Sequence, residues 1–91
     1  MLLDKIDIRI LNENFEYSVL NKLDKDNVNK IYNYLIDKGI YFAKDIFISN
    51  ADLFLMDFDL FAEKFDKLVN SLGNEYITKI EENYLLIESI Y

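Results

Sequence analysis

Two amphipathic patterns, each ending at one of the chain's only two glycines, constrain the fold more than any other feature. Before Gly39, the segment DNVNKIYNYLIDK carries apolar residues at Val28, Ile31, Tyr32, Leu35 and Ile36. Before Gly73, the segment DFDLFAEKFDKLVNSL carries them at Phe58, Phe61, Ala62, Phe65, Leu68, Val69 and Leu72. Spacings of three and four residues place these side chains on one face of an α-helix, so both segments are predicted to be amphipathic helices.

The residues that flank both patterns support these helices. Asp26 and Asp57 precede them, and an aspartate at this position caps a helix by accepting hydrogen bonds from free amides of the first turn. Gly39 and Gly73 fit the left-handed position that commonly follows the last turn. The chain contains no proline, which would interrupt a helix. An all-α fold is therefore predicted.

The segments that follow the two glycines are related to each other. GIYFAKDIFISNADLFL and GNEYITKIEENYLLIE align with a single-residue gap, which pairs Phe42 with Tyr76, Ile46 with Ile80, Asn50 with Asn83 and Leu53 with Leu86. The glycines are 34 residues apart, a period typical of stacked helical-pair repeats. We expect one domain, residues 1–91, with a partial repeat at 1–25 and helical units at 26–57 and 58–91. It would hold four to six helices in stacked pairs.

The N-terminal segment allows two interpretations. IDIRI and FEYSV each alternate between apolar and polar residues, with Asn12–Asn14 between them, as in a β-hairpin. That alternative gives an α+β fold with a hairpin at 4–20. A helical interpretation uses Leu3, Ile6 and Ile10, and it is favoured because residues 7–12 resemble residues 45–50 and an isolated hairpin is marginally stable.

Residues 26–88 contain a predicted helix, a Leu-x-x-x-Gly-Ile motif, a predicted short helix, an asparagine and a Leu-Phe-Leu run, in that order. This order resembles the repeats of mitochondrial transcription termination factor (mTERF) proteins. The matching residues are Leu35–Ile40, Ile46 and Leu53–Leu55, and in the second unit Leu68, Leu72, Gly73, Ile77, Ile80, Leu85 and Leu86. The resemblance implies stacked helices. The chain lacks the proline that the family places before its terminal leucines, where Asn50 and Asn83 stand, and it lacks the family's basic groove.

The composition excludes most catalytic chemistry. Without histidine or cysteine, the usual general base, thiol nucleophile and zinc ligands are missing. Two glycines are too few for a phosphate-binding glycine-rich loop. Asp24–Asp26 and Asp57–Asp59 have the D-x-D spacing that opens a calcium loop, but the later ligand positions are apolar. We predict no catalytic residue, no metal site, no cofactor and no enzyme activity.

Charge and apolar patterns point to a protein partner or to self-association. The net charge of −7 disfavours nucleic acids and anionic membranes. No apolar run approaches the ~20 residues that span a bilayer, and charges near Met1 argue against a signal peptide, so a cytoplasmic location is expected. If the last helix runs over 75–91, its apolar face is a candidate interaction surface formed by Tyr76, Ile80, Tyr84, Ile87 and Tyr91. The acidic candidates are Asp52, Asp57, Asp59, Glu75, Glu81, Glu82 and Glu88.

Three functions follow from these features. The first is a non-enzymatic interaction module that docks through an apolar helical face. The second is a small acidic inhibitor, immunity or anti-defence protein that blocks a nucleic-acid-binding enzyme. The third is nucleic-acid binding by mTERF-like repeats, which requires the basic residues to gather on one face.

The first two functions differ in what carries the affinity. If apolar docking dominates, Tyr76→Ala or Ile87→Ala should abolish binding, while charge reversal at Asp57 and Asp59 should have little effect. If the acidic surface dominates, the charge reversals should abolish binding and added salt should weaken it steeply. A binding assay at two salt concentrations separates the two.

Overall fold

The computed structural model describes residues 3–90, and within them the chain forms helices and no strand. The predicted all-α fold is confirmed, and the alternative hairpin at 4–20 is wrong. Six α-helices and two 3₁₀ helices follow one another along the chain: α1 (Lys5–Asn14), α2 (Tyr17–Leu20), α3 (Lys25–Asp37), α4 (Ala43–Ser49), η1 (Ala51–Leu55), α5 (Phe58–Leu72), α6 (Tyr76–Glu82) and η2 (Tyr84–Ile90).

A capping box explains why the N-terminal segment is helical. The side chain of Asp4 accepts a hydrogen bond from the amide of Asp7 at 2.8 Å, and the amide of Asp4 donates to the side chain of Asp7 at 3.1 Å. This reciprocal pair satisfies two amides that would otherwise be free at the start of a helix. The alternation of apolar and polar residues in IDIRI is therefore overridden, and Ile6 and Ile8 are left largely exposed.

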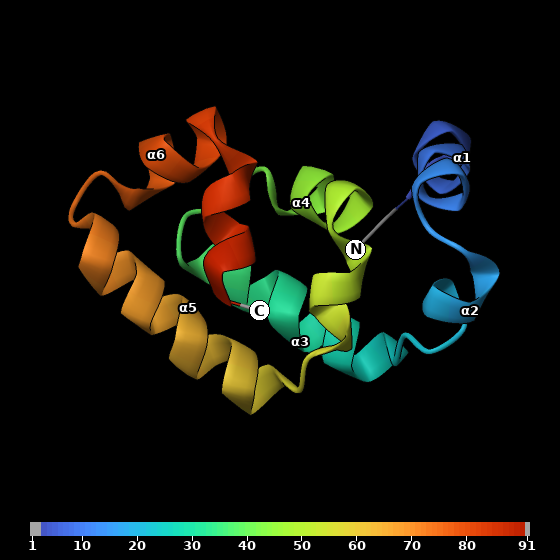
Figure 1. The fold of residues 1–91 in the computed structure, drawn as a ribbon, viewed down its shortest axis with the longest axis horizontal. Coiled ribbons are helices and arrows are strands. Elements are labelled where there is room, and N and C mark those ends of the chain that lie inside the picture. Colours follow the sequence, from blue (N-terminus) through green and yellow to red (C-terminus); the bar gives the residue numbers. More distant parts are fainter. Residues whose placement is uncertain (1–2, 91) are drawn as a thin grey trace.

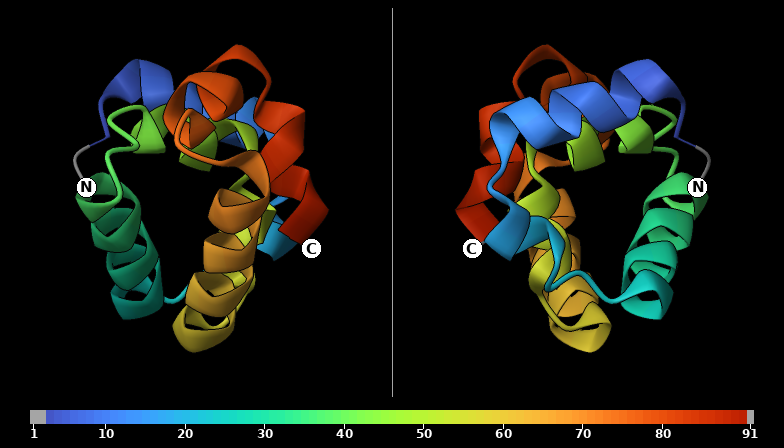
Figure 2. Two further views of the ribbon diagram at one scale, coloured as in Figure 1. Left: turned by 90° about the vertical axis from the view of Figure 1, so that its left-hand side faces the viewer. Right: turned by 90° about the vertical axis from the view of Figure 1, so that its right-hand side faces the viewer.

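The two long helices organise the molecule. In Figure 1, α3 and α5 lie beside each other and run in the same direction, because α4 and η1 carry the chain back between them. Figure 2 shows that α3 and α5 diverge toward their C-terminal ends, and that α1, α4 and α6 lie together across that wider end. The side chains of α3 and α5 that face each other thus meet the short helices in a single core.

The segment 39–57 forms the centre of this core. Its buried side chains are Ile40, Phe42, Ala43, Ile46, Phe47, Ile48, Asn50, Ala51, Leu53 and Phe54. Phe54 is fully buried and contacts Phe47 edge-on, with 4.9 Å between ring centroids. On its other side Phe54 lies 6.4 Å from Phe61, which stacks on Phe65 at 5.8 Å. Such aromatic contacts add to the free energy gained by burial alone.

The two helices predicted from the sequence bury most of their predicted apolar faces, but Ile36, which was expected on the face of α3, is 41% exposed. Val28, Ile31 and Leu35 of α3 are buried, as are Phe61 and Phe65 of α5. Gly39 and Gly73 follow these helices with φ angles of +86° and +82°, a region that favours glycine. Asp57 caps α5 as predicted, since its carboxylate accepts from the amide of Asp59 at 3.2 Å.

The predicted cap of α3 is wrong by two residues. Asp24, not Asp26, accepts hydrogen bonds from the first turn, from the amides of Asp26 at 2.8 Å and Asn27 at 3.2 Å. Because α3 therefore begins at Lys25, Asn27 lies in the first turn of the helix. Its side chain there faces the junction between η1 and α5.

Asn27 joins the start of α3 to that junction. Its side-chain amide donates to the backbone carbonyls of Phe54 at 3.2 Å and Met56 at 2.8 Å. Its side-chain oxygen accepts from the amide of Phe58 at 3.0 Å, which is one of the free amides at the start of α5. One side chain thus satisfies three backbone groups and fixes how the chain enters α5.

The order of elements is the same in both halves of the chain. A long helix, a glycine, a seven-residue helix, an asparagine and a 3₁₀ helix occur first in α3–η1 and then in α5–η2. The two halves meet closely at Gly39, where an added Cβ atom would lie 2.7 Å from the Cδ1 atom of Ile77 in α6. The domain boundaries and the repeat itself remain predictions.

Replacing Asn27 tests the role of its three hydrogen bonds. Asn27→Ala leaves two carbonyls and one amide without their partner, and we expect it to lower the free energy of unfolding by roughly 1–3 kcal/mol. The matched control is Asn33→Ala in the same helix, where the side chain is exposed and a change within about 0.5 kcal/mol is expected. Urea denaturation of the three proteins measures both effects. Equal stabilities of the two variants would contradict this role.

Candidate functional site

The C-terminal segment is not the continuous helix predicted over 75–91. α6 ends at Glu82, and Asn83 adopts an extended backbone with φ −150° and ψ 94°. The side-chain oxygen of Asn83 accepts from the amide of Leu85 at 3.1 Å. Asparagine side chains compete in this way with helical backbone bonds, and the chain continues as the 3₁₀ helix η2 in a new direction.

This break changes the position of the predicted apolar face. Ile80 and Ile87 are fully buried, Tyr76 and Tyr84 are half-buried, and Tyr91 lies outside the described residues. The interaction face expected from the sequence therefore mostly covers the core of its own chain. Ile80 and Ile87 cannot contact a partner, so Ile87→Ala would test folding and not docking.

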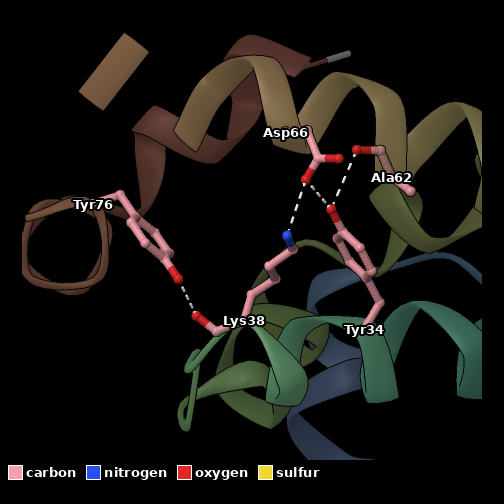
Figure 3. Close-up of polar contacts among 5 residues, drawn as sticks. All are labelled: Tyr34, Lys38, Ala62, Asp66 and Tyr76. Atoms are coloured by element: carbon pink, nitrogen blue, oxygen red, sulfur yellow. Dashed lines mark hydrogen bonds and ion pairs between the residues drawn. The ribbon is translucent and has the colours of Figure 1, made fainter. Parts of the chain in front are cut away.

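Tyr76 belongs to a cluster of polar contacts between the two halves of the chain. Figure 3 shows its hydroxyl directed at the backbone carbonyl of Lys38, at the end of α3. In the same cluster the hydroxyl of Tyr34 donates to the carboxylate of Asp66 and lies 3.3 Å from the carbonyl of Ala62. The ammonium of Lys38 lies 3.3 Å from the carboxylate of Asp66, so α3 is bound to both α5 and α6.

The electrostatics of this cluster favour a structural role. Burial, and then the carboxylate of Asp66, raise the pKa of Tyr34. The hydrogen bond from Tyr34, and then the ammonium of Lys38, lower the pKa of Asp66. A phenol with a raised pKa is a poor base at neutral pH, and a carboxylate with a lowered pKa stays charged. The ring of Tyr34 also contacts Phe58, Phe61 and Phe65 edge-on.

The most exposed apolar surface near the C-terminal segment lies beside Tyr84. Phe42 stacks on Tyr84 with 5.5 Å between centroids and 6° between planes, and Tyr41 contacts Phe42 edge-on at 5.1 Å. Tyr41 is 68% exposed, and Leu85, the residue after Tyr84, is 67% exposed. Phe42 itself is buried and Tyr84 is half-buried. We call these two residues, together with the exposed Tyr41 and Leu85, the aromatic patch. It is the candidate functional site.

Two carboxylates lie near the aromatic patch. The pKa of Tyr84 is raised, first by its burial and then by the negative charges of Asp45 and Glu81. Asp45 belongs to the first turn of α4, and Glu81 to the last turn of α6. The patch therefore has two carboxylates close enough to act on Tyr84, and charged groups near an apolar surface are typical of the polar rim of protein interfaces.

The other acidic candidates do not form one surface. Asp52, Asp57 and Asp59 lie in η1 and at the start of α5, whereas Glu81 and Glu82 end α6. Figure 1 shows the start of α5 at the bottom of the molecule, α6 at the top and the segment after α4 between them. Glu75 is exposed at the start of α6, and Glu88 accepts a hydrogen bond from the side chain of Asn50 at 3.1 Å.

The basic side chains are spread over the molecule and several are paired. Four of the ten lie in ion pairs: Arg9 with Glu13, Lys38 with Asp66, Lys44 with Asp7, and Lys67 with Glu63. The others are divided among α1, the loop before α3, α3, α5 and α6. This distribution does not resemble the single basic face that a nucleic-acid backbone requires.

Comparisons with protein-family models, curated proteins and solved structures found no match. Among residues 3–90, no three acidic side chains are grouped so as to hold a metal ion. No helix in that part of the chain has both the length and the apolar character needed to cross a membrane.

The polar cluster in Figure 3 predicts how stability depends on pH. Because folding raises the pKa of Tyr34 above its ordinary 10.0, the cluster's contribution is complete below pH 10 and is lost as pH rises above it. Because folding lowers the pKa of Asp66 below 3.8, its contribution is complete above pH 3.8 and is lost as pH falls further. Melting temperatures measured between pH 2.5 and 11 give both limbs of the pH–stability curve: the alkaline limb, set by Tyr34, and the acid limb, set by Asp66.

Tyr34→Phe should flatten the alkaline limb relative to wild type and weaken the acid limb, since its hydroxyl is the main cause of the lowered pKa of Asp66. Tyr17→Phe removes a phenol that is mostly exposed on α2, and its profile should match wild type. A Tyr34→Phe profile parallel to wild type at all pH values would contradict the assigned contacts.

Proposed function

We propose that this protein is a non-enzymatic interaction module that docks through the aromatic patch onto a basic surface of a partner protein. The observation that carries the proposal is the exposure of Tyr41 and Leu85 beside the stacked pair Phe42–Tyr84. Tyr41 contacts this pair directly, and Leu85 follows Tyr84 in the chain. Exposed apolar side chains that gather in one area mark interaction sites. Tyrosine and phenylalanine are also enriched at the centres of interfaces.

The choice of this surface over the predicted C-terminal face rests on burial. Tyr76, Ile80 and Ile87 are used to close the core, so they have little or no area left for a partner. Among the sequence candidates within residues 3–90, Tyr84 belongs to the aromatic patch, and Glu81 lies close enough to raise the pKa of Tyr84. Docking is therefore still expected to use apolar side chains, but those of the turn before α4 and the start of η2 in place of the predicted C-terminal face.

Charge supports a basic partner. The net charge of −7 gives the molecule a negative field, and Asp45 and Glu81 place two carboxylates beside the aromatic patch. A field of one sign accelerates encounter with a surface of the opposite sign, while the apolar contacts determine how long the complex lasts. The partner is therefore expected to present lysine or arginine around an apolar depression.

A second candidate is an acidic inhibitor that blocks a nucleic-acid-binding enzyme. The same net charge favours it, because the active surface of such an enzyme is basic. In that case the carboxylates of Asp57, Asp59, Glu81 and Glu82 carry the affinity, and the complex dissociates at high salt. The separation of these residues into two regions makes this the weaker proposal.

The mTERF resemblance stays a proposal about the arrangement of helices. The order of a long helix, a short helix and a 3₁₀ helix in each half supports stacked helical units. Nucleic-acid binding receives little support, because four of the ten basic side chains are paired with carboxylates and the rest are dispersed. No reaction is assigned to any of these residues.

The test is a tagged pull-down from the native host at physiological and at high salt, followed by affinity measurements with the purified partner. Tyr41→Ser and Leu85→Ser should each weaken binding at least tenfold, which corresponds to about 1.4 kcal/mol. Most of this loss should appear as a faster dissociation of the complex. Tyr17→Ser removes a tyrosine on α2 that is even more exposed than Tyr41, and it should bind like wild type.

Three results would contradict docking through the aromatic patch. Unchanged affinity of both patch variants would place the interface elsewhere. Equal losses for Tyr17→Ser would indicate a non-specific apolar contact. Retained binding in the patch variants, with loss on charge reversal at Asp57 and Asp59 and at high salt, would instead support the inhibitor.

A further inference from the structure

A pocket of about 350 Å³ lies between α5 and η2, away from the aromatic patch. Its lining combines cationic, hydroxyl and apolar side chains: Lys64, Lys67, Leu68, Ser71, Ser89 and Ile90. Its volume is at the lower end of the range of small-molecule sites. None of these residues has a part in the proposed docking surface, so the pocket carries an independent inference.

The α5 wall of the pocket presents two lysines. Lys64, Lys67, Leu68 and Ser71 follow the i, i+3, i+4, i+7 spacing and therefore share one face of the helix. Lys64 is half-buried and makes no ion pair with any residue in the described part of the chain. Lys67 lies 3.4 Å from Glu63, but both side chains are mostly exposed, and such pairs contribute little and exchange readily.

The opposite wall and the base of the pocket add hydroxyl and apolar groups. The hydroxyl of Ser89 donates to the carbonyl of Leu86 at 2.7 Å, while the side chain of Ser71 has no hydrogen bond within residues 3–90. Leu68 is half-buried, and Ile90 is only 4% exposed. The pocket therefore offers a cation and a free hydroxyl donor beside an apolar surface.

We propose that this pocket binds a small organic anion, with a carboxylate or phosphate head group and a short apolar chain. The ammonium of Lys64 and the hydroxyl of Ser71 would donate charge-assisted hydrogen bonds to the head group. The chain would lie along Leu68 and Ile90. An anion is repelled by most of a molecule with a net charge of −7, so such binding requires this local pair of lysines.

The first measurement is a titration of the isotope-labelled protein followed by amide NMR shifts. The probes are octanoate and octyl phosphate, with octanol as the uncharged analogue and acetate as the analogue without a chain. Saturable shifts centred on Ser71, Ser89 and Ile90 are expected for at least one of the two octyl anions. Octanol and acetate should bind at least fivefold more weakly than that anion, because each lacks one half of the recognised chemistry.

Variants then test the assigned contacts. Lys64→Gln should weaken binding of the better octyl anion at least fivefold and leave octanol unchanged. Lys30→Gln removes the same charge from an exposed position on α3 and should bind like wild type. The proposal is overturned if octanol binds as tightly as both anions, if Lys30→Gln weakens binding as much as Lys64→Gln, or if neither anion gives saturable shifts at millimolar concentration.

Discussion

Burial of the segment 39–57 is the constraint on which the rest of the structure depends. Nine of the eighteen buried hydrophobic side chains among the described residues lie within it, and Phe54 contacts rings from both sides. A 91-residue chain buries a smaller share of its surface than a large one does, and the buried apolar side chains of residues 3–90 form a single cluster. The helices α3 and α5 flank the segment, and α1, α6 and η2 cover what remains.

The need to cover the segment 39–57 explains which apolar residues are left exposed for a partner. The C-terminal residues Ile80 and Ile87 are buried because Asn83 ends α6 and turns η2 back onto the core. Tyr76 and Tyr34 are held by polar contacts between α3, α5 and α6. Tyr41 has no such role, and it extends the stacked pair of Phe42 and Tyr84 toward solvent.

The features predicted correctly from the sequence are those set by local patterns. The faces of α3 and α5, their terminal glycines and the Asp57 cap follow from spacings within one helix. The errors involve competition between nearby groups or contacts from distant segments. Asp24 and Asp26 could both cap α3, and the wrong one was chosen. The Asp4–Asp7 capping box is a further readable signal for the helix that was favoured in the N-terminal segment.

The aromatic patch could be predicted only in part for the same reason. Tyr41 lies outside the two amphipathic patterns in the sequence and contacts its neighbour Phe42. The stacking of Phe42 on Tyr84, however, joins segments about forty residues apart. The exposure of Leu85 depends on the turn at Asn83. The alignment of Asn83 with Asn50, which ends α4, marks this residue in the sequence but does not give the backbone angles of the turn. Asp45 and Glu81 likewise come near Tyr84 only in the folded chain.

Chemical labelling of the tyrosines, with and without the purified partner, tests the central claim most directly. In the free protein Tyr41 and Tyr17 should react fastest, because they are the most exposed of the described tyrosines. Partner binding should protect Tyr41 and leave Tyr17 reactive. Full reactivity of Tyr41 in the complex would contradict docking through the aromatic patch.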